Sequence, residues 1–326
     1  MARMSTTGSV QETRLARAGH LPLGDGHVMA WYEQGPVDGP PVLLLHGGPG
    51  SATSRRMLDL VDIGPLRLVS FDQRGCGHST PRGETRANTT DHLVRDIEVL
   101  RSHLHVASWL VVGGSWGATL GLAYAARHPA AVAGLLLRNL FVPSVADIAW
   151  FFQGAAARDP DAWQRFASVA PETARHDLLS WLAAAFAGGD DLVQVRAALA
   201  WWAWEQALSS APAAPLPAGP ALHALVDRYR IQAHYLAHAG WLGSEGLCSA
   251  ARASAMRPVL FLHGAEDAVC RPQSARMIQD LVAGSTFESV PGAGHDPFHP
   301  AMAQALRRAL DCFARSGRLA DPGRTA

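Results

Sequence analysis

The sequence predicts an α/β protein with a mostly parallel sheet and a helical segment inserted between the two halves of that sheet. Short apolar runs alternate with segments of helical spacing up to about residue 140, and again from about residue 251. Glycine-rich or charged turns follow several of the apolar runs. Because alternating strands and helices form a parallel sheet with helices on both faces, this order indicates an α/β core.

Each expected strand is a short apolar run. The run at 27–33 is followed by a polar turn, and we expect it to form an early antiparallel strand. The later runs are nearly continuous in apolar residues, which is typical of strands buried on both faces. The expected strands are 27–33, 41–46, 66–71, a run from 110 to 114, 131–137, 258–263 and 286–290.

The segments between these runs have the spacing of amphipathic helices. In one of them, Asn88–Asp91 supplies capping residues, and apolar residues then recur at spacings of three and four as far as Leu104. The other expected helices lie near 54–61, directly after Ser115, near 273–282 and at about 301–314.

From about Phe141 to Ala250 the alternation stops, and the pattern is helical and rich in alanine and tryptophan. A proline- and alanine-rich linker, Ala211–Pro220, divides this region, which we interpret as a helical cap inserted into the core. The expected organisation is an N-terminal extension at 1–20, the first part of the core at 21–140, the cap at 141–250, the second part of the core at 251–315 and a tail at 316–326.

Composition excludes several classes of protein. The chain carries 28 basic and 28 acidic residues, so neither nucleic acid nor an anionic membrane surface is an expected partner. No apolar run has the length of a membrane span and residues 1–20 contain no signal-peptide core, so we expect a cytoplasmic protein. The four cysteines form no CxxC pair and the 15 histidines are scattered, which predicts free thiols, no metal and no cofactor.

The stretch Leu110–Tyr124 has the pattern of a strand, a sharp turn and a helix. Its centre is a Gly-x-Ser-x-Gly motif in which Gly113 and Gly117 lack the Cβ atoms that would collide as the chain reverses. Such a turn exposes the serine Oγ, so Ser115 is the candidate nucleophile. An ordinary tight turn is the alternative, and residues elsewhere in the chain must decide.

A nucleophilic serine needs a base, and the base needs a third group that fixes its tautomer. Asp267 and His295 each follow an expected strand, at the edge where a parallel sheet places its ligand crevice. With Ser115 they occur in the order Ser, Asp, His of an α/β-hydrolase. Glu266 and Asp296 are rivals for the acid; we prefer Asp267 because it lies further past its strand, in a turn before a helix.

Two glycine-rich loops follow expected strands in the first half of the chain. In the HGGPG loop, backbone N–H groups are free to point beyond the strand end. We expect an oxyanion hole formed by the backbone N–H groups of Trp116 and Gly48, with Gly47 as the alternative to Gly48. A plain Gly/Pro turn is the other interpretation of this loop. In the next loop we expect Asp72 and Arg74 to brace the site rather than touch substrate.

Longer motifs extend this pattern over most of the chain. They are HGGPG at 46–50, FDQRGCGHS at 71–79, GGSWGATLGLAYAARHP at 113–129, LLLRNLF at 135–141, WFFQGAAARDPDAW at 150–163, WWAWE at 201–205, HGAEDAVC at 263–270 and GAGHDPF at 292–298. Together they closely resemble proline iminopeptidases, which are serine peptidases of the α/β-hydrolase type. The resemblance covers nearly everything after the first twenty residues.

The resemblance implies that carboxylates of the cap hold the free N-terminal amine of the substrate, and that an apolar pocket receives the first side chain, typically proline. Glu205 matches one such carboxylate, although it could also be a surface acid. Phe141 and Phe151 match pocket positions, with core packing as the alternative. The family usually has a second amine-binding glutamate where this chain has Gln232. It also commonly has Arg-Tyr in place of Ala265-Glu266, a change that should mainly affect loop packing.

The sequence therefore predicts a metal-independent serine aminopeptidase that releases an N-terminal residue, preferably proline, from short peptides. A related hydrolase of an ester, an amide or a metabolite is the alternative, because Gln232 weakens the expected amine recognition. A non-catalytic binding protein is disfavoured by the intact triad, and epoxide or haloalkane hydrolysis by Ser115, since those relatives use aspartate. The expected partner is a short peptide or a small amide or ester, and the oligomeric state is not predicted.

Overall fold

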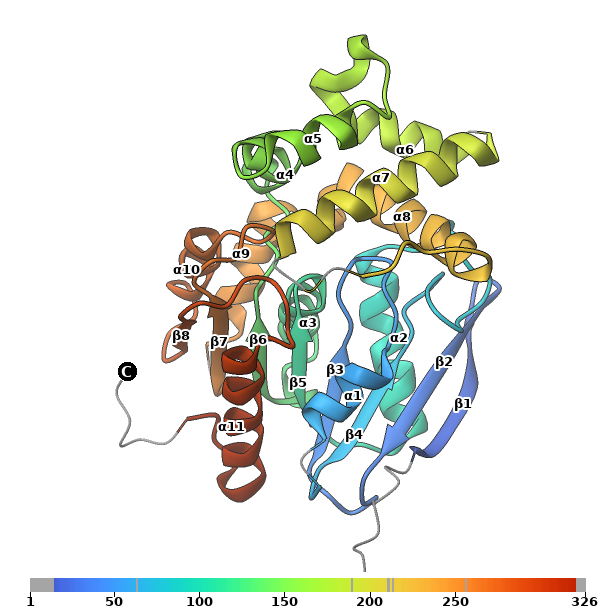
Figure 1. The fold of residues 1–326 in the computed structure, drawn as a ribbon. Coiled ribbons are helices and arrows are strands. Elements are labelled where there is room, and N and C mark those ends of the chain that lie inside the picture. The colour runs from blue at the N-terminus through green and yellow to red at the C-terminus, as the bar shows by residue number, and fades with distance from the viewer. Residues whose placement is uncertain are drawn as a thin grey trace, which may run out of the picture.

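The computed structural model describes residues 15–320 except Ile63, Gly189, Ser210, Ala211, Ala213 and Met256. Its centre is an eight-stranded sheet in the order β1-β2-β4-β3-β5-β6-β7-β8 (Figure 1). The pairs β1/β2 and β2/β4 are antiparallel, and all later pairs are parallel. The strands are β1 (Leu15–Gly24), β2 (His27–Gln34), β3 (Pro41–Leu45), β4 (Arg67–Phe71), β5 (Trp109–Gly114), β6 (Val132–Arg138), β7 (Val259–Gly264) and β8 (Thr286–Val290).

Helices connect the strands and form a separate layer beyond them. They are α1 (Arg55–Val61), α2 (Thr90–His103), α3 (Trp116–Arg127), α4 (Val145–Phe152), α5 (Pro160–Ala167), α6 (Leu178–Gly188), α7 (Asp191–Ser209), α8 (Pro220–Ala237), α9 (Gly243–Ala253), α10 (Pro272–Gln279) and α11 (Pro300–Ser316). Short 3-10 turns lie at Pro129–Ala131, Gly154–Ala157, Glu172–Asp177 and Ala239–Trp241.

The parallel strands bury both of their faces. Leu43 and Leu45 belong to a core shared with α2, α3, α9 and α10, whereas Val42 and Leu44 belong to a second core with α1 and α11. Successive side chains of a strand point to opposite faces, so a continuous apolar run fills both cores at once. The prediction of a mostly parallel sheet covered on both faces is confirmed.

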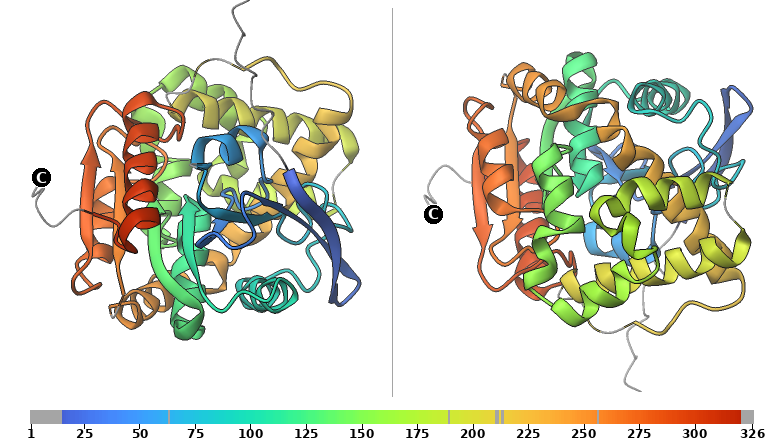
Figure 2. Two further views of the ribbon diagram at one scale, coloured as in Figure 1. Left: turned by 90° about the horizontal axis from the view of Figure 1, so that it is seen from below. Right: turned by 90° about the horizontal axis from the view of Figure 1, so that it is seen from above.

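Helices α4 to α8 lie across the end of the sheet where the parallel strands finish, and we call this layer the cap (Figure 1; Figure 2, right). Its own core is aromatic: Trp201 stacks on Tyr229 with ring centroids 5.0 Å apart, and Phe166 stacks on Trp204 at 6.2 Å. Helix α9 instead returns to pack on α3. No helix in the described ranges is long and apolar enough to cross a bilayer.

The structure adds detail at both ends of the chain. Strand β1 begins at Leu15, inside the stretch expected to be an N-terminal extension, and it carries Pro22, a residue that edge strands tolerate. Leu319, in the expected tail, is buried against the core beside α11. In the expected linker, Ala211 and Ala213 lie outside the described residues, and Pro220 already begins α8.

Candidate active site

Ser115 occupies the sharp turn between β5 and α3. Its φ of 56° and ψ of −123° lie in a region that residues with side chains rarely adopt, so the fold holds this residue under strain. A Cβ on Gly113 would lie 2.3 Å from the carbonyl oxygen of Gly117, and one on Gly117 would lie 2.3 Å from that of Leu45. Both positions therefore require glycine. The turn leaves Ser115 on the wall of a cavity, with 9% of its surface exposed.

A histidine on the wall of the same cavity is bonded to a carboxylate that does not itself line the cavity. His295 lies in the loop after β8, and its Nδ1 is 2.8 Å from Oδ2 of Asp267, which lies in the loop after β7. The Asp267 Oδ1 accepts the backbone N–H groups of Val269 and Cys270, both at 2.9 Å. Only 3% of Asp267 is exposed, so hydrogen bonds replace the water that this carboxylate has lost.

Burial alone would raise the pKa of Asp267, but the charge and hydrogen bond of His295, with help from His263 and the Cys270 N–H, hold that pKa below its usual value. An ionised carboxylate only accepts hydrogen bonds, so the proton in the pair lies on Nδ1 of His295 and Nε2 is left as a base. The rival acids point elsewhere. Glu266 is exposed, and Asp296 accepts the backbone N–H of Phe298.

Asn139 joins the loops of this pair, and the sequence analysis did not identify it. It follows β6, is fully buried and has a positive φ of 47°. Its Nδ2 donates to Oδ2 of Asp267 at 2.6 Å and to the carbonyl oxygen of Gly294 at 2.9 Å, and its Oδ1 accepts the N–H of Gly264. The available signal was a polar Arg138-Asn139 pair at the end of an otherwise apolar strand.

Cys270 lies against the candidate nucleophile, with its Sγ 3.8 Å from Oγ of Ser115. Burial first, and then the nearby charge of Asp267, raise the pKa of this thiol well above its usual value, so it stays protonated. Within the described residues, Asp267, Cys270 and His295 also offer ligand atoms that all lie within 4.8 Å of one another. Asp267 and His295 already bond to each other at 2.8 Å and Oδ1 of Asp267 accepts two backbone N–H groups, so we assign this set to the hydrogen-bonded pair rather than to a metal ion.

The HGGPG loop borders the cavity next to the serine turn. Both Gly47 and Gly48 line the cavity, and a Cβ on Gly47 would lie 3.3 Å from the Cβ of Ser115. Gly48 has a φ of 112°, which favours glycine. Trp116 is the first residue of α3, where backbone N–H groups have no acceptor within the helix. The loop and the helix start therefore offer donors on either side of Ser115.

A series of hydrogen bonds through Gln73 holds the HGGPG loop against the start of α3. The indole Nε1 of Trp116 donates to Oε1 of Gln73 at 3.0 Å. The Nε2 of Gln73 in turn donates to the carbonyl oxygen of His46 at 2.9 Å, and its backbone N–H donates to the ring Nε2 of His46 at 3.0 Å.

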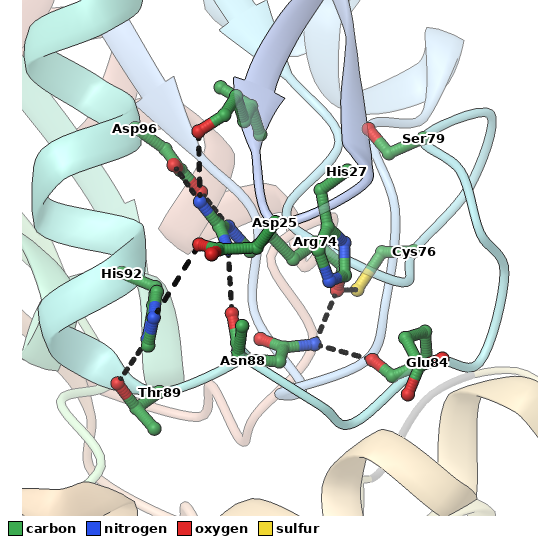
Figure 3. Close-up of polar contacts among 12 residues, drawn as sticks. Asp25, His27, Arg74, Cys76, Ser79, Glu84, Asn88, Thr89, His92 and Asp96 are labelled. Atoms are coloured by element: carbon green, nitrogen blue, oxygen red, sulfur yellow. Dashed lines mark hydrogen bonds and ion pairs between the residues drawn. The ribbon is translucent and has the colours of Figure 1, made fainter.

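Asp72 and Arg74, in the loop after β4, make hydrogen bonds that hold neighbouring loops in place, as the sequence analysis expected. Arg74 forms two hydrogen bonds to Asp96 of α2, at 2.7 and 2.8 Å, and a third to the carbonyl oxygen of Ala87 (Figure 3). Asp72 accepts the backbone N–H groups of Thr53 and His78 at 2.7 and 2.8 Å. Neither Asp72 nor Arg74 lines the cavity.

The cavity between the sheet and the cap has a volume of about 310 Å³. Phe141 and Phe151 both line it. The other apolar lining residues include Ile148, Phe152, Leu236 and Val269. A charged wall with Glu205 and Arg228 lies where α7 and α8 face each other.

On this wall the structure brings Glu205 and Gln232 together, and it adds partners that the sequence did not suggest. The Gln232 Nε2 donates to Oε1 of Glu205 at 2.6 Å. The Glu205 Oε2 accepts Nη2 of Arg228 at 2.7 Å and the hydroxyl of Tyr229 at 2.9 Å. The carboxylate is therefore already engaged by a cation and two neutral donors.

Comparison with known proteins places the fold and the site in one class. A family model described as the alpha/beta hydrolase fold matches residues 40–301, which include Ser115, Asp267 and His295. The crystal structure of a proline iminopeptidase-related protein from Thermus thermophilus has 24% identity and a TM-score of 0.57, and covers 92% of this chain and 98% of its own. The chain is thus an α/β-hydrolase.

Relatives in sequence identify the family within the α/β-hydrolases. A proline iminopeptidase of Xylella fastidiosa (strain 9a5c) is 38% identical over 299 residues, which cover 90% of this chain and 96% of that protein. A proline iminopeptidase of Neisseria gonorrhoeae is 35% identical over 298 residues, with 90% and 95% covered. This protein belongs to the proline iminopeptidase family.

Proposed function

We propose that the protein is a serine aminopeptidase that releases an N-terminal residue, preferably proline, from peptides through an acyl-enzyme. The observation that carries this proposal is the strained turn of Ser115 in a cavity that is also lined by His295, the partner of Asp267. The names of the relatives support the reaction and the substrate class.

In the proposed reaction, Ser115 Oγ attacks the carbonyl carbon of the first residue while His295 Nε2 takes the hydroxyl proton. The oxyanion accepts hydrogen bonds from the backbone N–H groups of Trp116 and Gly48, or of Gly47 in its place. His295 then gives its proton to the leaving nitrogen as the C–N bond breaks. Water repeats these steps on the acyl-enzyme and releases the first residue and Ser115.

The cavity is suited to a small apolar residue. Phe141 and Phe151 offer aromatic surface of the kind that packs on a proline ring, and the cap closes the far side of the cavity. The cap wall with Glu205 and Gln232 would then face the substrate nitrogen. A hydrolase of esters or amides with relaxed amine recognition is the second candidate, and the pairing of Glu205 with Arg228 favours it.

The test is a panel of aminoacyl 4-nitroanilides that includes proline, assayed beside an N-blocked prolyl anilide and a simple aryl ester. We expect the prolyl anilide to be a good substrate, and we expect Ser115→Ala to lower kcat by at least about 10⁴-fold with an unchanged circular dichroism spectrum. Unchanged turnover in purified Ser115→Ala would rule out the serine mechanism. Turnover of the ester alone would favour the second candidate.

A further inference from the structure

The cap wall is electrically neutral at the place where a charged amine would be expected to bind. Glu205 and Arg228 form an ion pair at 2.7 Å, and 15% and 32% of their side chains are exposed. A carboxylate offers about four acceptor positions, and donors from Arg228, Tyr229 and Gln232 use three of those on Glu205. Little of the Glu205 charge is left for a ligand.

Two polar atoms on this wall lack a partner. They are Oε1 of Gln232 and Nε of Arg228, which are both buried and make no hydrogen bond to any described residue. The Gln232 amide cannot be turned round, because its oxygen would then face the Glu205 carboxylate. A buried acceptor without a donor is costly, so Gln232 Oε1 marks a place for a hydrogen-bond donor from a ligand.

The neighbouring groups do not restore a negative charge. Burial lowers the pKa of His46 and raises the pKa values of Cys76 and Tyr229, so all three are neutral near pH 7. Of the carboxylates close by, Asp227 pairs with Arg230 at 2.9 Å and Asp147 pairs with Arg271 at 2.8 Å. Asp72 accepts three hydrogen bonds from neutral donors, and it does not line the cavity. Arg138 adds a further cation to the cavity lining.

We propose that this wall binds the first residue of the substrate with its nitrogen uncharged, as the free-base amine, or with a hydroxyl group in the same place. A neutral donor satisfies Gln232 Oε1 and the remaining acceptor position of Glu205. An ammonium group would have to approach the guanidinium of Arg228 without an uncompensated carboxylate to balance it. This inference rests on the proposed function, since it assumes that the substrate nitrogen faces Glu205 and Gln232.

The test uses two substrates that differ only at this position, L-alanyl and L-lactoyl 4-nitroanilide. The first carries an α-ammonium group below a pH of about 7.7 to 8, and the second carries a neutral hydroxyl at every pH used. The quantity measured is the ratio of kcat/KM for the alanyl over the lactoyl substrate, on one enzyme preparation, from pH 6 to pH 9. Effects of pH on the folded fraction and on the catalytic groups apply to both substrates and cancel in this ratio.

For the wild type we expect the lactoyl substrate to be at least as good as the alanyl substrate at pH 6. We expect the ratio to rise about tenfold for each pH unit until the substrate amine has lost its proton. Two variants should each give the cap wall a net negative charge. Arg228→Gln removes the cation, and Gln232→Glu adds a carboxylate. Each should raise the ratio at pH 6 by at least about tenfold and flatten its dependence on pH. Arg228→Lys keeps the charge and is the matched control, with a ratio close to that of the wild type.

The outcomes separate this inference from the proposed function. A wild type that prefers the alanyl substrate at pH 6 by tenfold or more, with no gain in either variant, overturns the inference and leaves the aminopeptidase intact. An enzyme that cleaves an aryl ester but none of the aminoacyl or lactoyl anilides loses the proposed function, and the inference falls with it.

Discussion

Two carboxylates belong to the candidate active-site region, one in the loop after β7 and one in the cap, and their surroundings differ. Among the described residues, Asp267 is hydrogen-bonded by backbone N–H groups, the Asn139 amide and His295 and by no arginine, so its charge acts on His295, the proposed base. Glu205, in the cap, is bonded by the permanent cation of Arg228, so its charge is cancelled where it lies. The carboxylate of the core thus stays uncompensated by a permanent cation and faces His295, whereas the carboxylate of the cap is neutralised by Arg228.

The difference between the two carboxylates follows from which elements supply their hydrogen-bond partners. The partners of Asp267 come from β-strand ends that share one hydrogen-bonded sheet, and changing one of them disturbs the others. Arg228, Tyr229 and Gln232 all lie on α8, within about one helical turn. Substitutions on that single turn can change which substrate is recognised without altering the catalytic groups.

The largest effect that separates the two regions should come from Asp267→Asn. Its amide would oppose the Nδ1 proton of His295 and favour the wrong tautomer, so we expect kcat to fall by about 10³- to 10⁴-fold. Because the base serves every substrate, the prolyl, alanyl and lactoyl anilides should lose activity to the same extent. Unequal losses would show that Asp267 also takes part in recognition.

Glu205→Gln should have a smaller and substrate-dependent effect. The wall would then carry the net positive charge of Arg228, and we expect kcat/KM for the alanyl substrate at pH 6 to fall by about tenfold. The lactoyl substrate has no charge at this position and should change by less than about threefold. Equal losses with both substrates would mean that Glu205 supports the fold of the cap rather than the choice of substrate.

Asn139→Ala should affect the catalytic side without affecting recognition. Loss of its hydrogen bond leaves the Asp267 carboxylate less well solvated, and we expect kcat to fall by about tenfold with little change in KM. With one donor fewer, the charged form of Asp267 is less stabilised and its pKa rises, so the acid limb of the kcat profile should move to higher pH. A lower thermal stability with an unchanged pH profile would indicate a purely structural role.

The smallest change in turnover should come from Cys270→Ser, which keeps a small polar group beside Ser115. We expect kcat to change by less than about threefold, since this thiol takes no part in the proposed reaction.

A bulky thiol reagent, by contrast, should inactivate the wild type by displacing the groups around Cys270 Sγ, which lies 3.8 Å from Ser115 Oγ. Inactivation should be faster at higher pH, because the pKa of Cys270 is raised. Cys270→Ser should resist the reagent, and Cys248→Ser, at a more exposed cysteine, should remain sensitive. Inactivation of Cys270→Ser at the wild-type rate would contradict this placement.

The sequence by itself determined the features that depend on local spacing. Apolar runs of strand length predicted β2 to β8 to within a few residues at each end, because side chains buried on both faces of a parallel sheet leave a continuous apolar signal. The turn at Ser115 was partly local, since the clash that requires Gly113 is with the Gly117 carbonyl four residues on, whereas the clash that requires Gly117 is with the Leu45 carbonyl, which only the folded sheet brings close. β1 was missed because an edge strand with one exposed face carries a weak, mixed pattern.

Only the tertiary structure decided which polar side chains bond to each carboxylate of the site and whether that carboxylate's charge is neutralised. Asn139 and Asp267 are 128 residues apart, and Glu205 and Arg228 are 23 residues apart on two separate helices. No periodicity links such positions, because their contact depends on how the strand ends and the cap helices are placed after folding. The motifs could identify Glu205 as a carboxylate of the cap. Whether its charge reaches a substrate depends on the guanidinium 2.7 Å away, and the folded arrangement of α7 and α8 alone sets that distance.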